Sequence, residues 1–537
     1  MTFRAFPWIM LAGPGLMLVA CQTTLSASPA ETASPAETAD TLIINGTVYD
    51  GSGSRARQVD IAISGDKIVA LGSDLDSRYR ASSTIDANGL IVAPGFIDPH
   101  THAGSDLASK QAKRRANLAY IHQGVTTVVV GNDGFGRPDI SAMAEQATRG
   151  GIGTNVAYLA GFGPIREAAL GKANRAPTGP ELAQMKATTR LAMCEGAWGL
   201  SAGLYYVPQN YAKTDEIIAL AKITSEFGGY YDTHMRDEST YNITVTGAVN
   251  EAIEIGREAG LPVHIAHIKA LGPAVWGHSK KMITAIESAR ADGLRVTADQ
   301  YPWTASGTRI SNALVPRWAL EGGLEKLRER LADSGQLSEI RKAMIAGLER
   351  RGGAERLLIT GKLGDADVPL GKTLAELSAD VGRSPVDTAL AILRHGDARV
   401  ASFNMNADDI AAFAERDWVV TGSDGSTGHP RKYASFPKAY RDLVVDGDMD
   451  LARFIRRSSA MTAEIIGLQK RGYLKAGYAA DLVLFNPDTF APVATYQSPR
   501  ELSQGVQHLL VNGVPVIKDG KYTGALPGFP LLKRNGC

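Results

Sequence analysis

Two kinds of hydrophobic pattern divide the chain. Residues 41–93 and 471–530 contain short runs in which apolar and polar residues alternate, broken by turn pairs such as Asn45-Gly46. Alternation with a period of two predicts strands that bury one face, and Asn-Gly favours a tight hairpin. We therefore expect one small β-sandwich domain that is assembled from both terminal segments of the chain.

Between these segments, in residues 94–470, short apolar runs alternate with stretches of helical spacing. This alternation is typical of βα units and a parallel sheet, and eight units predict an α/β fold of the (β/α)8 TIM-barrel type. The eight candidate strands are 91–98, 126–131, 155–160, 197–201, 230–234, 263–267, 295–301 and 418–424. Active sites of such barrels lie at the carboxyl ends of the strands.

Residues 316–417 form a stretch that is too long for a single connection within a barrel. Apolar residues recur there at helical spacing, from Leu320 to Leu331 and from Leu337 to Leu348. We expect an inserted, mostly helical region before the last strand, with these leucines in its core.

The first 20 residues contain one early cation, Arg4, and then an apolar segment that is short for a membrane span. This pattern predicts an export signal. Its end, Leu18-Val19-Ala20-Cys21, resembles the lipobox of bacterial lipoproteins, in which the cysteine is lipidated; an ordinary signal peptide is the alternative. Residues 21–40, rich in Ser, Thr, Ala, Pro and Glu, predict a flexible linker. We expect a periplasmic protein whose only link to the membrane is this anchor.

The charge balance and the cysteines narrow the range of partners. Lys and Arg number 57 and Asp and Glu 56, so the net charge of +1 gives no electrostatic reason to expect a nucleic acid, and a small-molecule substrate is favoured. The three cysteines, Cys21, Cys194 and Cys537, are far apart in sequence. Their spacing suggests neither a disulfide framework nor a thiolate zinc site.

The candidate chemistry lies where the predicted strands end. His100 and His102 are separated by one residue, so in an extended backbone both point to the same face and can bind one metal ion. Further histidines and carboxylates stand at or just beyond other strand ends, and a barrel would gather them into one ring of nitrogen and oxygen ligands that suit zinc. These residues are Asp133, His234, His267 and Asp424.

His264 and His267 are three residues apart, and on a strand they would face opposite sides. We therefore expect only one of them to be a ligand, and we choose His267 because it lies nearer the strand end. The whole set predicts one or two zinc ions.

These residues belong to motifs that, taken in order, resemble the amidohydrolase superfamily and, within it, the D-aminoacylase (N-acyl-D-amino-acid deacylase) family. The motifs include Pro94-Gly95-Phe96-Ile97-Asp98-Pro99-His100-Thr101-His102, Gly199-Leu200-Ser201-Ala202-Gly203-Leu204, Thr233-His234-Met235-Arg236, Ala266-His267-Ile268-Lys269, Asp299-Gln300-Tyr301-Pro302, Gly422-Ser423-Asp424-Gly425 and His429-Pro430-Arg431. The resemblance implies that His100, His102, His234 and His267 bind metal. It implies that Asp424 is the general acid and base.

One position departs from the family pattern. The family usually has Asn-Cys-Gly after the second strand, with the thiolate shared by two metal sites, whereas this chain has Asn132-Asp133-Gly134. A carboxylate also has two lone-pair-bearing atoms that can bridge ions, although it is a harder ligand than a thiolate. The alternatives are a weakened one-metal site or a changed substrate preference.

The resemblance further implies that Lys269, Tyr301, Ser306 and Arg431 hold the α-carboxylate of the substrate. A surface ion pair for Arg431 and core packing for Tyr301 are the structural alternatives. The resulting hypothesis is a zinc-dependent hydrolase of a linear amide bond, acting on N-acyl-D-amino acids or on dipeptides with a C-terminal D-residue. The D-stereochemistry follows from the resemblance alone. A cyclic-amide hydrolase of the dihydroorotase or hydantoinase type and a non-catalytic metal-binding or ligand-binding lipoprotein are the competing interpretations.

Overall fold

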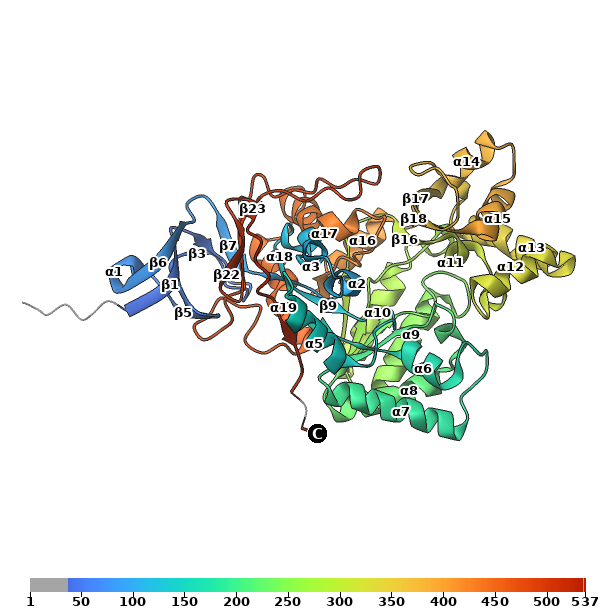
Figure 1. The fold of residues 1–537 in the computed structure, drawn as a ribbon, viewed down its shortest axis with the longest axis horizontal. Helices are drawn as coiled ribbons and strands as arrows, with labels where there is room; N and C mark the ends of the chain where they lie inside the picture. The colour runs from blue at the N-terminus through green and yellow to red at the C-terminus, as the bar shows by residue number, and fades with distance from the viewer. Residues whose placement is uncertain (1–36, 535) are drawn as a thin grey trace, which may run out of the picture.

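The computed structural model describes residues 37–534, 536 and 537. Three parts follow one another along the long axis in Figure 1: a β-sandwich, a central barrel and an inserted lobe. The predicted export signal, Cys21 and residues 21–36 of the predicted linker lie outside the described residues. None of the described helices is both long enough and apolar enough to cross a bilayer.

The β-sandwich contains two sheets. The first has the strand order β5-β4-β1-β6, and the second has the order β23-β22-β21-β20-β7-β2-β3. Their bounds are β1 (Glu37–Ile44), β2 (Thr47–Val48), β3 (Arg57–Gln58), β4 (Asp60–Ser64), β5 (Lys67–Gly72), β6 (Tyr79–Asp86), β7 (Ile91–Pro94), β20 (Leu482–Phe485), β21 (Val506–Val511), β22 (Val514–Lys518) and β23 (Lys521–Tyr522), with α1 (Leu75–Arg78) before β6. Strand β20 pairs antiparallel with β7, so both ends of the chain build the second sheet.

The predicted linker is wrong at its carboxyl end. Strand β1 already begins at Glu37, which pairs with Tyr79, and Ala39 in this strand is buried. The sequence did not indicate this start of the strand, because Glu37 to Asp40 resembles the polar segment before it. Only the pairing with β6 makes these residues a strand.

The predicted barrel is confirmed, with the helices outside a ring of parallel strands (Figure 1). Its strands are β8 (Phe96–Asp98), β9 (Val125–Val130), β10 (Asn155–Tyr158), which continues as β11 (Ala160–Gly161), β12 (Gly199–Gly203), β13 (Tyr230–His234), β14 (Val263–Ile265), β15 (Val296–Gln300) and β19 (Val419–Thr421). The ring closes where the amide of Asp424 donates to the carbonyl of His100, 3.0 Å away. Strand β9 is buried at every position, as its β-branched sequence favours.

The predicted first strand, 91–98, is in fact two strands. Strand β7 belongs to the sandwich and β8 to the barrel, with Gly95 between them. A Cβ atom at Gly95 would lie 2.2 Å from the side chain of Thr126, so the chain can pass from one domain to the other only where no side chain is present.

The barrel helices pack apolar faces against the strands. They are α2 (Gly104–Leu107), α3 (Ala112–Arg115), α4 (Leu118–Ile121), α5 (Ile140–Gly150), α6 (Phe162–Leu170), α7 (Gly179–Cys194), α8 (Thr214–Glu226), α9 (Thr244–Ala259), α10 (Ser279–Ala291), α16 (Ala407–Ala414), α17 (Arg431–Tyr440), α18 (Leu451–Ser458) and α19 (Ala460–Ile466), with short turns at Gln209–Tyr211, Pro273–Val275 and Arg441–Val445. Helix α7 begins in a capping box between Thr178 and Glu181.

The inserted lobe differs from the prediction in its limits and in its content. It runs from β16 (Ser306–Arg309) to β18 (Gly396–Ser402), and β17 (Leu357–Gly364) completes an antiparallel sheet of order β16-β18-β17. Its helices are α11 (Ile310–Leu314), α12 (Leu324–Ala332), α13 (Ser334–Arg350), α14 (Leu374–Asp380) and α15 (Pro385–His395), with turns at Arg317–Leu320 and Ala354–Arg356. Its own hydrophobic core includes Leu327, Leu331, Ile340 and Met344. The sheet escaped prediction because Ser306 to Arg309 carries no hydrophobic signal.

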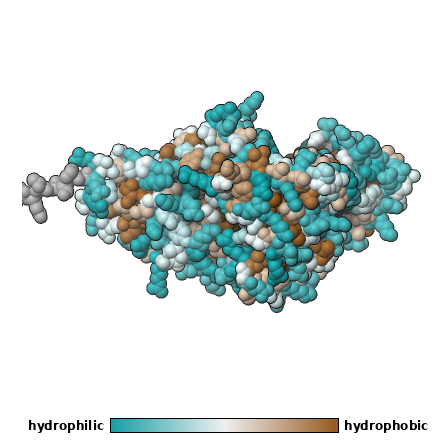
Figure 2. Space-filling model, turned by 90° about the horizontal axis from the view of Figure 1, so that it is seen from below, coloured by the Kyte–Doolittle hydropathy of each residue, from teal (hydrophilic) through white to brown (hydrophobic). Residues whose placement is uncertain are grey.

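The carboxyl-terminal segment crosses back onto the barrel. Strand β24 (Pro530–Leu531) pairs with β10, and Cys537 forms a disulfide with Cys194 at the end of α7. The expectation of no disulfide was therefore wrong for this pair. The two cysteines are 343 residues apart in sequence, and the segment that begins with β24 brings them together, with the amide of Lys533 donating to the carbonyl of Gly196. Figure 2 shows a face on which hydrophilic residues predominate and apolar residues form small scattered groups.

Candidate metal and active site

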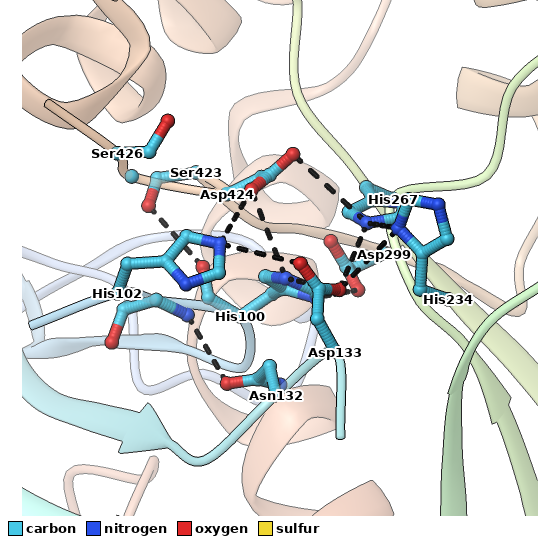
Figure 3. A network of polar contacts seen from close by, with 12 residues as sticks. His100, His102, Asn132, Asp133, His234, His267, Asp299, Ser423, Asp424 and Ser426 are labelled. Atoms are coloured by element: carbon cyan, nitrogen blue, oxygen red, sulfur yellow. Dashed lines mark hydrogen bonds and ion pairs between the residues drawn. The ribbon is translucent and has the colours of Figure 1, made fainter. Parts of the chain in front are cut away.

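The histidines and carboxylates singled out from the sequence meet at the carboxyl end of the barrel (Figure 3). His100 and His102 follow β8, Asp133 follows β9, and His234 ends β13. His267 comes just after β14 and Asp424 just after β19. All six side chains belong to one network of polar contacts, and only the side chain of His102 has substantial exposure, at 30%.

Asp133 lies at the centre of this network. Its Oδ1 atom is 3.4 Å from Nε2 of His100, 3.3 Å from Nε2 of His267 and 3.5 Å from Nδ1 of His234. Its Oδ2 atom faces the other way and is 3.4 Å from Nε2 of His102. The two carboxylate oxygens therefore serve different histidines, as a bridging ligand requires.

These separations fit zinc. Two donor atoms that each lie about 2.1 Å from one tetrahedral zinc ion are about 3.4 Å apart. The buried atoms Nδ1 and Nε2 of His100 and Nε2 of His234 also have no hydrogen-bond partner among the described residues. Buried polar atoms without partners are costly, and a cation between the rings would remove part of that cost.

Asp424 lies at the edge of the cluster and faces a cavity between the barrel and the inserted lobe. Its Oδ1 atom is 3.1 Å from Nε2 of His102, and its Oδ2 atom is 2.8 Å from Nη1 of Arg431. One carboxylate thus contacts a candidate metal ligand and a buried guanidinium. This position allows it to exchange a proton with a molecule bound beside the cluster.

Glu238 is a site residue that the sequence interpretation missed. It lies four residues after His234, and its Oε2 is 3.6 Å from Nε2 of that ring. Its Oε1 is 3.4 Å from Nδ1 of His267 and 2.6 Å from Nζ of Lys269. Together, His234, Glu238 and His267 form a second group of donor atoms that could hold a metal ion. The spacing His234-x-x-x-Glu238 beyond a strand was the available signal.

The expectation that His264 and His267 face opposite sides was wrong. Strand β14 ends at Ile265, so the alternation of a strand does not extend to His267. The ring of His264 bonds to Asp299, at 3.1 Å, and Asp299 in turn lies 3.8 Å from His100. His264 therefore belongs to the same network, in which Asp299 links it to His100.

Three site residues have an unusual backbone. Asp133, His267 and Asp424 have φ angles of +57°, +37° and +47°. Non-glycine residues seldom adopt the left-handed region, and such strain concentrates at functional sites. Each of these residues comes just after its strand, and the turn directs the side chain over the barrel mouth.

The carboxylates of the cluster are held in their ionised form. Burial raises the pKa of Asp133, but His100 and its other imidazole neighbours outweigh burial and hold this pKa well below its usual range. Burial likewise opposes ionisation of Asp424, yet Arg431 and the histidines hold its pKa below the usual range. Against the effect of burial, the same carboxylates raise the pKa of His100 to about 10. The ionised carboxylates therefore stabilise positive charge at the imidazole of His100, and a metal cation would supply that charge in place of the proton.

A cavity of about 450 Å³ opens above the cluster, between the barrel and the inserted lobe. The four residues predicted to bind a substrate carboxylate all line it: Lys269, Tyr301, Ser306 and Arg431. The hydroxyl of Tyr301 is buried and has no hydrogen-bond partner among the described residues. The side chain of Ser306 bonds to that of Asn404 at 3.0 Å.

The predicted cations Lys269 and Arg431 are already paired, with Glu238 and Asp424. Three further arginines on the lobe, missed by the sequence interpretation, line the same cavity: Arg351, which donates to the hydroxyl of Ser402, and the pair Arg309 and Arg399. Arg309 and Arg399 lie directly opposite each other on β16 and β18, and neither has an ion-pair partner among the described residues. No sequence signal marked them, because the antiparallel pairing that juxtaposes them was itself not predicted.

Comparison with known proteins places this site in a family. The sequence model of the amidohydrolase family matches residues 83–306 and 368–517. The chain belongs to the amidohydrolase family. D-aminoacylase of Alcaligenes xylosoxydans xylosoxydans is 32% identical, over 92% of this chain and 98% of the relative. N-acyl-D-aspartate deacylase of the same organism is also 32% identical, over 94% of this chain and 95% of the relative.

Solved structures of amidohydrolases agree with this placement. The N-acyl-D-glutamate deacylase from Bordetella bronchiseptica, complexed with zinc and a phosphonate inhibitor, has a TM-score of 0.79 and 29% identity; the match covers 92% of this chain and all of that one. A crystal structure of D-aminoacylase has a TM-score of 0.76 and 31% identity, with the same coverage. A D-hydantoinase from Thermus sp., at 16% identity and a TM-score of 0.52, shows the shared fold alone.

Proposed function

We propose that this amidohydrolase is a zinc-dependent deacylase that hydrolyses the amide bond of N-acyl-D-amino acids. The observation that carries the proposal is the buried cluster in which Asp133 contacts four histidines and Asp424 stands beside them, at the mouth of a barrel. Relatives named for D-aminoacylase and N-acyl-D-amino-acid deacylase activity match nearly the whole chain, which supports the linear amide and the D-stereochemistry. The dihydroorotases match only 49% of it.

The residues that would hold zinc are His100, His102, Asp133, His234 and His267, whose donor atoms have the separations described above. When bound, zinc lowers the pKa of a coordinated water to about 7 and polarises a carbonyl group. These two effects are what hydrolysis of an unactivated amide requires.

Asp424 moves the proton. Because Arg431 and the histidines keep its pKa low, the carboxylate is ionised and can accept a proton from the attacking water. It then delivers this proton to the amide nitrogen, which is a poor leaving group unless it is protonated. Arg431, 2.8 Å from Oδ2, leaves Oδ1 directed toward His102 and the cluster.

We further propose that the substrate has a free carboxylate. The unpartnered hydroxyl of Tyr301 and the unpaired guanidinium groups of Arg309 and Arg399 line the cavity above the cluster. Guanidinium groups and hydroxyls are the donors that recognise a carboxylate. An anionic substrate would relieve the repulsion between the two facing arginines.

We propose that the protein is exported and held at the periplasmic face of a membrane through Cys21. The apolar segment and lipobox-like end of residues 1–21 support this, and the disulfide between Cys194 and Cys537 is typical of an oxidising compartment. Mass spectrometry of the mature protein is expected to find an acylated Cys21 at the N-terminus. A free N-terminus at another residue would refute the anchor.

The function is tested by a hydrolysis screen of the zinc-supplied protein. The substrates are N-acyl-D-amino acids, their L-isomers, dipeptides with a C-terminal D-residue and cyclic ureides. We expect turnover of the N-acyl-D-amino acids, and turnover of the cyclic ureides alone would identify the protein as a cyclic-amide hydrolase instead. Absence of any turnover by a zinc-loaded protein would favour a binding protein.

The variant Asp424→Asn is expected to retain zinc and to lose about 10²- to 10⁴-fold in kcat, the usual contribution of a general acid or base. Asp409→Asn is the matched control, because Asp409 is also buried but, within the described part of the chain, accepts hydrogen bonds only from the amides of Gly277 and Ser279. Equal turnover in Asp424→Asn and in the control would remove Asp424 from the mechanism.

A further inference from the structure

A second cavity, of about 340 Å³, opens beside the cluster. It shares three lining residues with the first cavity, His102, Ser105 and Phe135, so the two meet at the candidate metal ligand. The second cavity extends from this junction between α2, α5 and the ends of β9 and β10. It therefore adjoins the place where the amide bond would be cleaved.

The wall of the second cavity is mainly apolar. Its lining includes Leu107, Val130, Met143, Ala147, Tyr158 and Leu159. Among the described residues that line it, Arg137 is the only arginine or lysine; it is exposed and pairs with Asp139. Such a wall suits an uncharged hydrocarbon group and not a carboxylate.

Phe135 lies where the two cavities meet. It is 52% exposed, which is unusual for a phenylalanine, and its ring lies 5.2 Å from that of Tyr206. It follows Asp133 by two residues, so this apolar ring stands at the edge of the cluster. An exposed aromatic ring at the joint of two cavities is well placed to cover a bound aliphatic chain.

The two cavities have opposite characters on opposite sides of the barrel mouth. In the ring of eight strands, β15, which precedes Tyr301, is four positions away from the β10–β11 strand, which borders the apolar cavity. Tyr301 and the arginines of the lobe therefore lie across the cluster from Tyr158 and Leu159. An N-acyl amino acid has a matching arrangement of polar and apolar groups, with a carboxylate on one side of the amide bond and a hydrocarbon chain on the other.

We propose that the apolar cavity receives the acyl chain, so that this enzyme prefers N-acyl-D-amino acids with medium-length aliphatic acyl groups over their N-acetyl counterparts. The inference rests on the proposed deacylase function and extends it to the acyl side of the substrate. Each methylene that enters an apolar cavity contributes about fourfold in binding, since burial of one methylene is worth about 0.8 kcal/mol.

The test compares kcat/KM of the full-length, zinc-supplied enzyme on N-acetyl, N-butanoyl, N-hexanoyl and N-octanoyl derivatives of one D-amino acid. We expect kcat/KM to rise about fourfold per added methylene until the cavity is filled. A flat or falling series with good N-acetyl turnover would overturn the acyl cavity and leave the deacylase function intact. Failure to hydrolyse any member would overturn both.

Variants on α5 test whether the preference for longer acyl chains arises from this cavity. Ala147→Leu should fill it and reduce the preference for hexanoyl over acetyl at least tenfold, whereas Met143→Ala should enlarge it and move the optimum to a longer chain. Ala142→Leu adds the same bulk on the exposed face of α5 and serves as the matched control. If Ala147→Leu does not fold, the chain-length optimum of Met143→Ala by itself tests the proposal. A chain-length preference that neither cavity variant alters would overturn the proposal.

Discussion

Replacing Asp133 with asparagine tests whether this residue takes the place of the family's cysteine. Asparagine has the same shape, but it has no charge and only one acceptor oxygen. In the present structure, Oδ1 lies 3.3 to 3.5 Å from nitrogens of His100, His234 and His267, and Oδ2 lies 3.4 Å from His102. Asparagine can therefore face one set of histidines as an acceptor but not both.

The expected loss can be worked out from electrostatics. A unit negative charge about 2.1 Å from a divalent ion attracts it by about 4 kcal/mol, even with the dielectric constant of water. This energy corresponds to about a thousandfold in the dissociation constant for zinc. Burial of Asp133 strengthens this attraction, because screening by water is weaker inside the protein.

The assay combines elemental analysis of zinc per chain with competition against a chelator of known affinity. We expect Asp133→Asn to lose zinc occupancy and affinity, Asp133→Cys to keep both because a thiolate can bridge, and Asp409→Asn to match the unmodified protein. Unchanged stoichiometry and affinity in Asp133→Asn would show that Asp133 is not a ligand.

Three further predictions concern the surroundings of the cluster. Arg431 lowers the pKa of Asp424, so Arg431→Gln should raise that pKa. The acid limb of the kcat/KM profile should then move to higher pH by about one unit or more, which is the Coulomb energy of the two charges at 2.8 Å. A limb that stays at the same pH would contradict this. Cys537→Ser removes the disulfide and should destabilise the fold by about 2–4 kcal/mol, seen as a lower Tm that reductant does not lower further. Gly95→Ala places a Cβ 2.2 Å from a threonine side chain and should cost about 1–3 kcal/mol. Gly179→Ala, whose Cβ meets no described atom within 4 Å at the start of α7, should not lower the Tm, because alanine favours a helix more than glycine does.

The sequence predicted those features that depend on local order along the chain. The barrel follows from apolar runs that alternate with helical spacing, and the sandwich follows from period-two runs at both ends. His100 and His102 could be recognised because they are separated by one residue just beyond the end of a strand. His234, His267 and Asp424 could be recognised because each stands where a strand stops.

Features that arise from contacts between distant segments were not predictable in this way. Glu238 joins the cluster only because the loop after β13 folds back over His267. Arg309 and Arg399 become a pair only through the register of β16 with β18. The partner of Cys194 arrives through a strand of two residues, β24, which is too short to leave a periodic pattern.

The sequence by itself determined the architecture of this protein and most members of its metal cluster, because hydrophobic periodicity and strand ends are local properties. Only the tertiary structure decided how these residues are used. It placed Asp133 between two sets of histidines, paired Arg431 with Asp424, and put an apolar cavity beside His102 across from a cationic wall. The physical reason is that charge pairing, ligand geometry and cavity shape depend on distances in space, and strand register and loop conformation set those distances.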